Sequence, residues 1–438
     1  MTLFHGTVID TPEDPFHTDP ASALRADADG GLLVADGVIT DRGPFPELQR
    51  RYPDEPVTDL RGGLVLPGFV DTHVHYPQIR AIGGLGMPLL EWLERCALPE
   101  ESRLVDPAYA ELLADDFLDG LLASGTTSAL VFGAHFAPAM DVLFAGAERR
   151  GLNMTSGLVL SDRILRPDLL CTPEQAHTDS SALIERWHGR GRLRYAVTPR
   201  FSLSTTEAML EVCSELLGPD LAFTTHLNEN PTEVAQVAAL FPDSANYLDT
   251  YDRHRLVTDR SVFAHNVHAT DAELDVLAAA GAWAAHCPTS NAALGSGLFP
   301  LRRHVERGVG VALGSDVGGG TGLFLGKEAL QAYFMQQLLG AAGLPLTPVH
   351  LLYLATRAGA RALGCGDRVG DFGVGKEFDA VWIRPTPGSP LAVNLDNAAD
   401  ATDLLARTFA LANPADVAGV WLQGRRARGG SHPGESAH

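Results

Sequence analysis

Two histidines that stand two residues apart follow an apolar run of strand length. The run is Gly63–Val70, and it leads directly into Asp71–Thr72–His73–Val74–His75. Because residues two apart on a strand point to the same side, we expect His73 and His75 to face one space. Pairs of imidazoles bind Zn²⁺ and similar borderline metals. Alone the pair indicates little, since two exposed histidines would show the same spacing, so the interpretation depends on the rest of the chain.

Other ionisable residues end apolar runs elsewhere in the sequence. His226 and His265 are each the last residue of a short run, and Asp316 follows a third. In a barrel of parallel strands such positions lie together at the carboxyl ends, where barrel enzymes place their active sites. Glu229 comes three residues after His226, where a carboxylate can exchange protons with water at a metal without being a ligand. The pattern predicts a metal centre with an acid–base group beside it.

The elements that must position these residues alternate between strand and helix. Eight apolar runs separated by helical patterns predict an α/β fold, a (β/α)₈ barrel of the TIM type. The strand candidates are Gly63–Val70, Ser128–Phe132, Thr155–Leu160, Arg194–Thr198, Ala222–His226, Val262–His265, Ala282–His286 and Gly310–Gly314. Helices are predicted over Pro107–Ala123, Thr206–Leu217, Thr232–Leu240 and Thr270–Ala280.

Both ends of the chain have the pattern of short strands separated by turns. Strands are expected over Leu3–Ile9, Gly31–Ala35, Val38–Thr40, Phe378–Ile383 and Val417–Leu422. We therefore predict that residues 1–65 and 370–438 form a small β-sandwich module and that residues 66–369 form the metal-dependent barrel. The tail after Gly429 is expected to be frayed.

Composition and charge exclude several classes of protein. The 438 residues include 33 Lys and Arg against 54 Asp and Glu, a formal net charge of −21, so we expect no nucleic-acid partner. No apolar run is long enough to span a membrane, and Met1–His5 does not begin a signal peptide, so we expect no membrane partner. The five cysteines form no CxxC pair, which favours reduced thiols and a cytoplasmic protein.

Several motifs resemble the amidohydrolase superfamily, in its branch of deaminases with one catalytic metal. They are Pro67–Gly68–Phe69–Val70–Asp71–Thr72–His73–Val74–His75, His226–Leu227–Asn228–Glu229, Ala264–His265, His286–Cys287–Pro288–Thr289–Ser290–Asn291 and Gly314–Ser315–Asp316. More narrowly, further segments resemble the guanine deaminases of that superfamily. They are Tyr76–Pro77–Gln78, Leu89–Leu90–Glu91–Trp92–Leu93, Thr198–Pro199–Arg200–Phe201–Ser202 and Asp316–Val317–Gly318–Gly319–Gly320.

The resemblance implies one Zn²⁺ per chain and the hydrolysis of guanine to xanthine and ammonia by a zinc-bound hydroxide. The implied metal ligands are His73, His75, His226 and Asp316. The implied catalytic residues are Glu229 as proton shuttle, Asp316 as a base and His265 close to the metal and its water. The implied substrate contacts are Gln78, Arg200, Phe201, His226, Glu229 and Asp316. The chemistry agrees, because a metal lowers the pKa of bound water to about 7 and two carboxylates can carry the protons that move.

Arg200 favours guanine as the substrate, because the paired N–H donors of its guanidinium group match a ring carbonyl and an adjacent acceptor. Alternatives stay open at this point: a small-molecule substrate that is another aminopurine, a pterin or a triazine, or a non-catalytic binding protein on the same fold. We also expect a homodimer. Asn228 departs from the family pattern, in which a small residue is expected before the glutamate. The segment Leu89–Leu93 fits core, lid or dimer contact, and supporting roles are possible for three histidines near strand ends, His135, His268 and His286.

Overall fold

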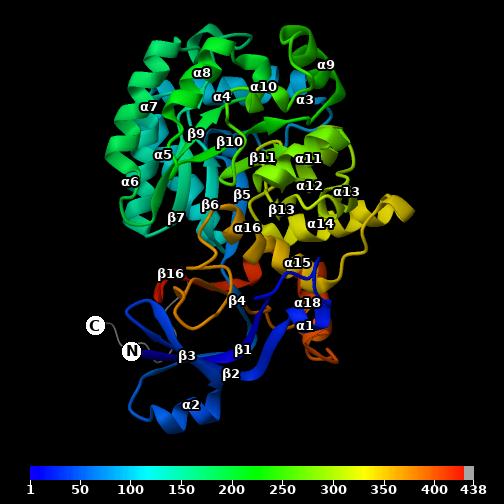
Figure 1. Ribbon diagram of the computed structural model, residues 1–438. Coiled ribbons are helices and arrows are strands. Elements are labelled where there is room, and N and C mark those ends of the chain that lie inside the picture. The colour runs from blue at the N-terminus through cyan, green and yellow to red at the C-terminus, as the bar shows by residue number, and fades with distance from the viewer. Residues whose placement is uncertain (429–438) are drawn as a thin grey trace.

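The apolar runs pair into two separate sheets (Figure 1). The computed structural model describes residues 1–428, so the frayed tail predicted after Gly429 lies outside the described residues. One sheet is a ring of parallel strands. They are β5 (Phe69–His75), β6 (Thr126–Phe132), β7 (Asn153–Gly157), β9 (Leu193–Pro199), β10 (Ala222–Leu227), β11 (Ser261–His265), β12 (Trp283–His286) and β13 (Gly310–Leu313), with the short β8 (Val159–Leu160) beside β9.

Hydrogen bonds close this ring between its first strand and the end of its last strand with the turn that follows. Thr72 Oγ1 donates to the carbonyl of Leu313 at 2.8 Å, and the amide of Asp316 donates to the carbonyl of His73 at 2.8 Å. Small and branched apolar side chains fill the interior, among them Leu130, Ala196 and Ala285, all buried. The eight predicted strands are thereby brought into one barrel, with their carboxyl ends at a common face.

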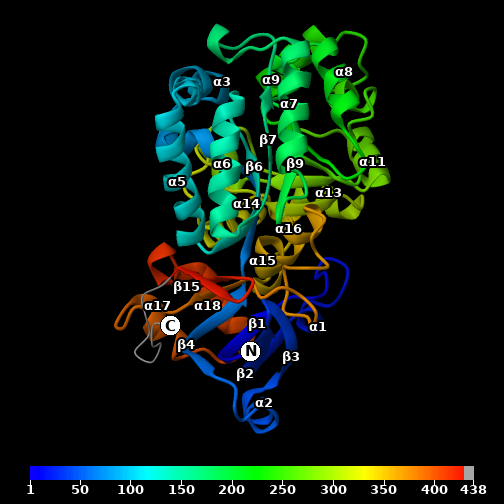
Figure 2. The same ribbon diagram turned by 90° about the vertical axis from the view of Figure 1, so that its left-hand side faces the viewer.

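Helices surround the barrel on its outer side (Figure 2). They are α3 (Leu89–Trp92), α4 (Leu98–Ser102), α5 (Pro107–Ala123), α6 (Ala137–Arg150), α7 (Pro173–Trp187), α8 (Glu207–Leu216), α9 (Pro231–Leu240), α10 (Asp249–Asp252), α11 (Asp271–Ala280), α12 (Pro288–Ala293), α13 (Leu301–Glu306), α14 (Leu325–Leu338), α15 (Pro348–Ala355) and α16 (Arg357–Ala362). Local signals set their ends: Asp106 caps α5, whose first residue is Pro107, and Thr270 begins a capping box for α11.

The predicted bounds of the first barrel strand, Gly63–Val70, are wrong. Residues as far as Pro67 belong to β4 (Val57–Pro67), which pairs with β1 and β14 in the other sheet, and the barrel strand begins at Phe69. The apolar run continues across this break because the end of β4 and all of β5 are buried. Hydrophobicity alone therefore does not mark the boundary, and the two histidines lie inside β5 rather than after a strand.

The second sheet combines both ends of the chain, in the order β16-β15-β14-β4-β1-β2-β3. Its other strands are β1 (Thr2–Asp10), β2 (Arg25–Ala35), β3 (Val38–Pro44), β14 (Ala380–Ile383), β15 (Val417–Leu422) and β16 (Arg425–Arg428), and the helices of these segments are α1 (Pro20–Ala23), α2 (Phe45–Arg51), α17 (Pro390–Leu395) and α18 (Ala401–Leu411). The predicted fold class is confirmed. The division into modules at residues 65 and 370 stays a prediction.

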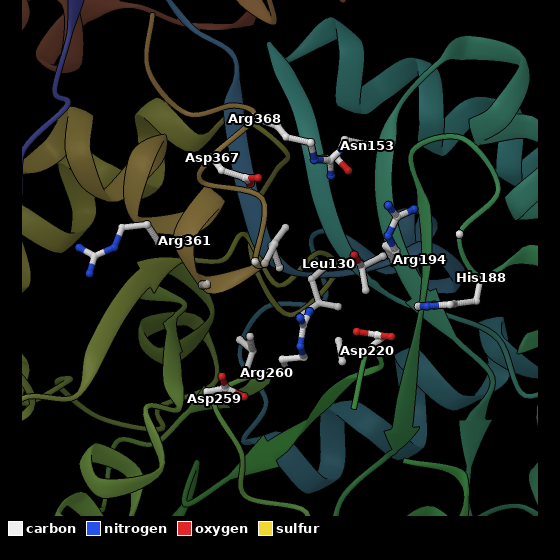
Figure 3. Close-up of a pocket in the computed structure, with 17 residues that line it drawn as sticks. Leu130, Asn153, His188, Arg194, Asp220, Asp259, Arg260, Arg361, Asp367 and Arg368 are labelled. Atoms are coloured by element: carbon white, nitrogen blue, oxygen red, sulfur yellow. The ribbon is translucent and has the colours of Figure 1, made fainter. Parts of the chain in front are cut away.

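The opposite end of the barrel holds a separate cavity of about 590 Å³ (Figure 3). Side chains of both charges line it near the amino ends of the strands, among them Arg194, Arg260, Asp220 and Asp259. The residues singled out for chemistry lie at the other end. Within residues 1–428, no helix is both long and apolar enough to cross a membrane.

Gly314 allows β13 to pack closely against the strand that carries the histidines. A Cβ atom here would lie 2.8 Å from the Cβ of His73 and 3.0 Å from the Sγ of Cys287. We expect Gly314→Ala to lower the free energy of unfolding by about 1–3 kcal/mol, because overpacking forces neighbours apart. The matched control is Gly218→Ala, where no atom lies within 4 Å of the added carbon. Urea denaturation measures both, and equal midpoints for the two variants would contradict the packing account.

Candidate active site

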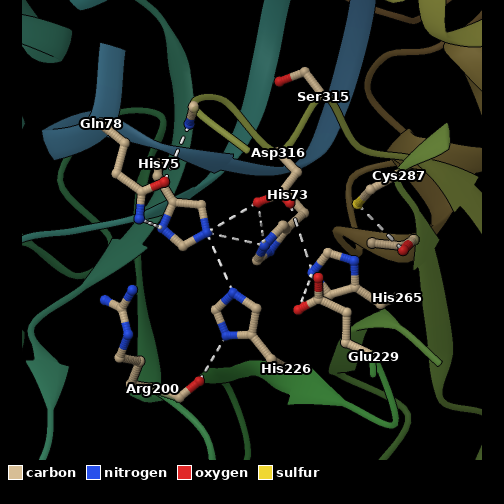
Figure 4. Close-up of polar contacts among 12 residues, drawn as sticks. His73, His75, Gln78, Arg200, His226, Glu229, His265, Cys287, Ser315 and Asp316 are labelled. Atoms are coloured by element: carbon tan, nitrogen blue, oxygen red, sulfur yellow. Dashed lines mark hydrogen bonds and ion pairs between the residues drawn. The ribbon is translucent and has the colours of Figure 1, made fainter. Parts of the chain in front are cut away.

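Three imidazoles and one carboxylate converge at the carboxyl ends of the barrel strands (Figure 4). The Nε2 atom of His75 lies 3.1 Å from Nε2 of His73 and 3.3 Å from Nε2 of His226. The Oδ1 atom of Asp316 lies 3.2 Å from Nε2 of His73 and 3.1 Å from Nε2 of His75. All four side chains are buried. Strand ends far apart in the sequence therefore meet as the spacing predicts.

This spacing matches the ligand atoms of one tetrahedral metal ion. Zinc–nitrogen bonds of about 2.0–2.1 Å place neighbouring ligand atoms about 3.3 Å apart. Burial lowers the pKa of His75 to about 4 and that of His226 well below its usual value. Burial opposes the charged form of Asp316, but the surrounding histidines outweigh it and hold the pKa of this carboxyl well below its usual range. Neutral imidazoles and an ionised carboxylate form the donor set that zinc prefers.

His265 adds a fifth group at the edge of the cluster. His73, His226, His265 and Asp316 also offer ligand atoms that lie within 4.8 Å of one another. The Nε2 atom of His265 lies 3.7 Å from Oδ2 of Asp316 and 3.5 Å from Oε2 of Glu229, and it has no hydrogen-bond partner. A catalytic ion keeps one position for water, so we do not expect all five groups to be its ligands.

Hydrogen bonds at the far side of two rings fix their orientation. Nδ1 of His226 lies 2.7 Å from the carbonyl of Arg200, and Nδ1 of His265 lies 2.9 Å from Oδ1 of Asn291. Because each Nδ1 donates its proton to an oxygen, each Nε2 keeps a free lone pair. His265 and Asp316 adopt left-handed backbone conformations, with φ of 69° and 49°. Such conformations are uncommon outside glycine and cluster at functional sites.

Glu229 is held beside the cluster by the start of the following helix. Ser296 Oγ donates to its Oε1 at 3.0 Å, and its backbone amide donates to Glu233 at 3.1 Å. Glu233 belongs to the capping box that begins α9. Burial, together with the nearby Asp316, raises the pKa of Glu229 to about 8. The protonated and ionised forms of this carboxyl group are therefore both accessible near neutral pH.

The unusual Asn228 has a structural explanation. Its φ of 48° lies in the left-handed region, which asparagine tolerates better than most residues. Its side-chain amide donates to Asn266 at 3.2 Å and to Glu273 at 3.0 Å. Because Asn228 is buried among these groups and does not line the neighbouring cavity, its departure from the family pattern concerns the turn after β10.

A small cavity lies against the cluster and contains the expected recognition residues. Its lining consists of His75, Gln78, Leu89, Trp92, Leu93, Arg200, Phe201, His226, Glu229, His265, Leu294 and Asp316. Leu89, Trp92 and Leu93 line this cavity and also belong to the main hydrophobic core, and the dimer contact stays a prediction. The cavity volume is about 20 Å³, room for about one water molecule. Side chains that line it must therefore move to admit a ring.

Glu101 is a buried polar residue beside the cavity that the sequence did not reveal. It lies in α4, is 2% exposed, and contacts Gln78, His135 and Arg200. The helix carries two adjacent glutamates, Glu100 and Glu101. Nothing in the local pattern indicates which of them turns inward, because the choice depends on the loops that pack over the helix.

The three histidines near strand ends occupy different surroundings. The Nε2 atom of His268 donates to the carbonyl of Ser296 at 2.7 Å, so it supports the residue that holds Glu229. The ring of His286 stacks on Phe299, with 4.3 Å between centroids. His135 lies 3.2 Å from Glu101 through Nε2. None of the three belongs to the metal-ligand cluster.

Comparison with known proteins identifies the family. The sequence matches the Amidohydrolase family over residues 64–427. A probable guanine deaminase of Deinococcus radiodurans is 58% identical, over 97% of this chain and 98% of its own length. The chain therefore belongs to the amidohydrolase family. Its full-length similarity places it with the guanine deaminases of that family.

Solved structures agree with this placement. The guanine deaminase of E. coli superimposes with a TM-score of 0.94 and 38% identity, over 97% of this chain and 99% of the other. A guanine deaminase of C. acetobutylicum with guanine bound in its active site superimposes with a TM-score of 0.89 and 26% identity, over 97% and 99% of the two chains. The barrel with its separate terminal sheet is thus the fold of this family.

Proposed function

We propose that this chain hydrolyses guanine to xanthine and ammonia. One observation carries the proposal: the cavity that adjoins the histidine–aspartate cluster is lined by Gln78, Arg200 and Phe201. The site therefore combines a place for a metal, a proton carrier and a polar recognition wall. The full-length similarity to guanine deaminases supports the same substrate.

We propose that one Zn²⁺ per chain is held by His73, His75, His226 and Asp316. The contacts of 3.1–3.3 Å among their ligand atoms support this set. When bound, the ion supplies the Lewis acidity that makes water a nucleophile near neutral pH. In this arrangement His265 lies between Glu229 and Asp316 and can hydrogen-bond the attacking water.

The two carboxyl groups divide the proton transfers between them. Glu229 accepts a proton from the attacking water and donates it to the ring nitrogen beside the carbon that carries the amine. Asp316 takes the second proton through Oδ2 and returns it to the amine, which leaves as ammonia while the carbon gains its oxygen. The raised pKa of Glu229, about 8, matches this role, since it can hold and release a proton near neutral pH.

Arg200 and Phe201 provide the groups that hold a purine. Phe201 presents a buried ring to the cavity, and purines stack well on aromatic faces. Arg200 uses Nη1 for Glu101 at 2.6 Å, so its other nitrogens remain to donate to a ring carbonyl and its neighbour. The homodimer and the cytoplasmic location expected from the sequence stay predictions.

The choice between the two ligand sets can be tested by paired substitutions. We expect His75→Ala to lose bound zinc, because it removes one of four ligands. His265→Ala should keep zinc near one equivalent per chain and lose turnover. Metal analysis of the purified proteins measures both. Loss of zinc from the His265 variant alone would show that the alternative set, with His265 in place of His75, is correct.

Replacing Glu229 tests the proton carrier. Glu229→Gln keeps the size of the side chain but cannot carry the proton, so turnover of guanine should fall by about 10²–10⁴-fold. Zinc content should stay at the wild-type value, since Glu229 is not a ligand. Steady-state kinetics with metal analysis checks this. Retention of more than about a tenth of the turnover would contradict the role.

The substrate itself is tested by ammonia release from a panel of ring amines. Adenine has an amine where guanine has its six-position carbonyl, so the buried donors of Arg200 would face another donor. Unpaired buried polar groups can give discrimination of about 10⁴-fold or more. We expect guanine to react and adenine to be essentially inert, while a pterin and a triazine in the same panel test the alternative substrates. Equal rates with guanine and adenine would exclude guanine recognition by Arg200.

A further inference from the structure

The carboxylate of Glu101 joins both polar recognition residues. Its Oε1 accepts from Nε2 of Gln78 at 2.7 Å, and its Oε2 accepts from Nη1 of Arg200 at 2.6 Å. Nε2 of His135 lies 3.2 Å from the same Oε2. Glu101, Gln78 and Arg200 are each no more than 2% exposed. One carboxylate thus makes three contacts in a space that water hardly reaches.

Charge compensation explains why a carboxylate is needed there. A guanidinium buried to this extent is costly unless an opposite charge pairs with it. Burial opposes ionisation of Glu101, but Arg200 and His135 outweigh it, and the pKa of this carboxyl stays well below its usual range. The Glu101–Arg200 pair is therefore a neutral unit, and the wall that it forms carries no net charge toward a substrate.

The same carboxylate also fixes the amide of Gln78. Its Nε2 faces Glu101, and its Oε1 accepts from the amide of Gly318 at 3.1 Å. These two partners define which end of the amide is the donor. Oε1 therefore remains an acceptor, with one lone pair left for a donor on the substrate.

We propose that Glu101 is a positioning and specificity-determining residue for base recognition. It aims Arg200 and Gln78 at the substrate, and it cancels the charge of Arg200 so that the site selects a neutral base over an anionic one. The proposal rests on guanine being the substrate. Glu101 makes no direct hydrogen bond to the proposed metal ligands; its nearest link to them is Gln78, whose Nε2 also lies 3.3 Å from Nδ1 of His75.

The adjacent Glu100 provides a matched control. It belongs to the same helix but accepts from Tyr109 at 2.6 Å and from Arg103 at 2.9 Å, outside the cavity. The test compares Glu101→Gln with Glu100→Gln in the zinc-loaded enzyme. We expect kcat/KM for guanine to fall about 10-fold or more in Glu101→Gln, the value of a buried hydrogen bond to a charged group. Zinc content should not change, and Glu100→Gln should resemble wild type.

Inhibition by xanthine separates this role from a general structural one. In mildly alkaline solution xanthine is partly an anion, and Glu101→Gln leaves the Arg200 cation unpaired. The inhibition constant of the Glu101→Gln variant for xanthine should therefore fall several-fold. If the substitution merely loosened the site, the variant would bind xanthine more weakly. Glu101→Asp keeps the charge, so it should lose kcat/KM for guanine while keeping the wild-type inhibition constant.

The outcomes are distinguishable. If wild type and Glu100→Gln convert guanine and Glu101→Gln matches them, the inference is overturned and the proposed function stands. If Glu101→Gln binds xanthine no more tightly than wild type, the claim that Glu101 cancels the charge of Arg200 is wrong. Should Glu101→Gln fail to fold, unchanged kcat/KM in Glu101→Asp overturns the inference. If neither wild type nor Glu100→Gln converts guanine, the proposed function fails, and the inference fails with it.

Discussion

The site depends on the convergence of three imidazoles and one ionised carboxylate on one buried point. Their neighbouring ligand atoms lie 3.1–3.3 Å apart, and all four side chains are buried. Without a cation, this arrangement would leave buried acceptors facing one another, which is costly. A barrel of parallel strands can meet this constraint, because its carboxyl ends bring residues from distant parts of the chain to one face.

A second constraint is the burial of a positive charge beside that point. Arg200 belongs to the turn after β9, and its counter-charge Glu101 comes from α4, which follows the Leu89–Leu93 segment in the chain. The recognition wall is therefore assembled from a turn and a helix that are far apart in the sequence. Pairing makes the wall polar yet neutral, which suits an uncharged, donor- and acceptor-rich ring.

Site residues could be predicted from the sequence where an ionisable residue stands at the end of an apolar run of strand length. His226, His265 and Asp316 each stand at a strand end, so the eight-strand pattern placed them together. It failed at the junction of β4 and β5, where one apolar run serves two sheets. It also missed Glu101, because inward and outward glutamates on a short helix look alike until tertiary packing separates them.

Titration of the metal-free protein with Zn²⁺, while ammonia release from guanine is followed, tests the central claim most directly. The ligand cluster has room for one ion, so activity should rise in proportion to added zinc and reach its plateau at about one equivalent per chain. The rise should be absent when His73 or Asp316 is replaced by alanine. Full activity in the metal-free protein, or a plateau at two equivalents, would contradict the account.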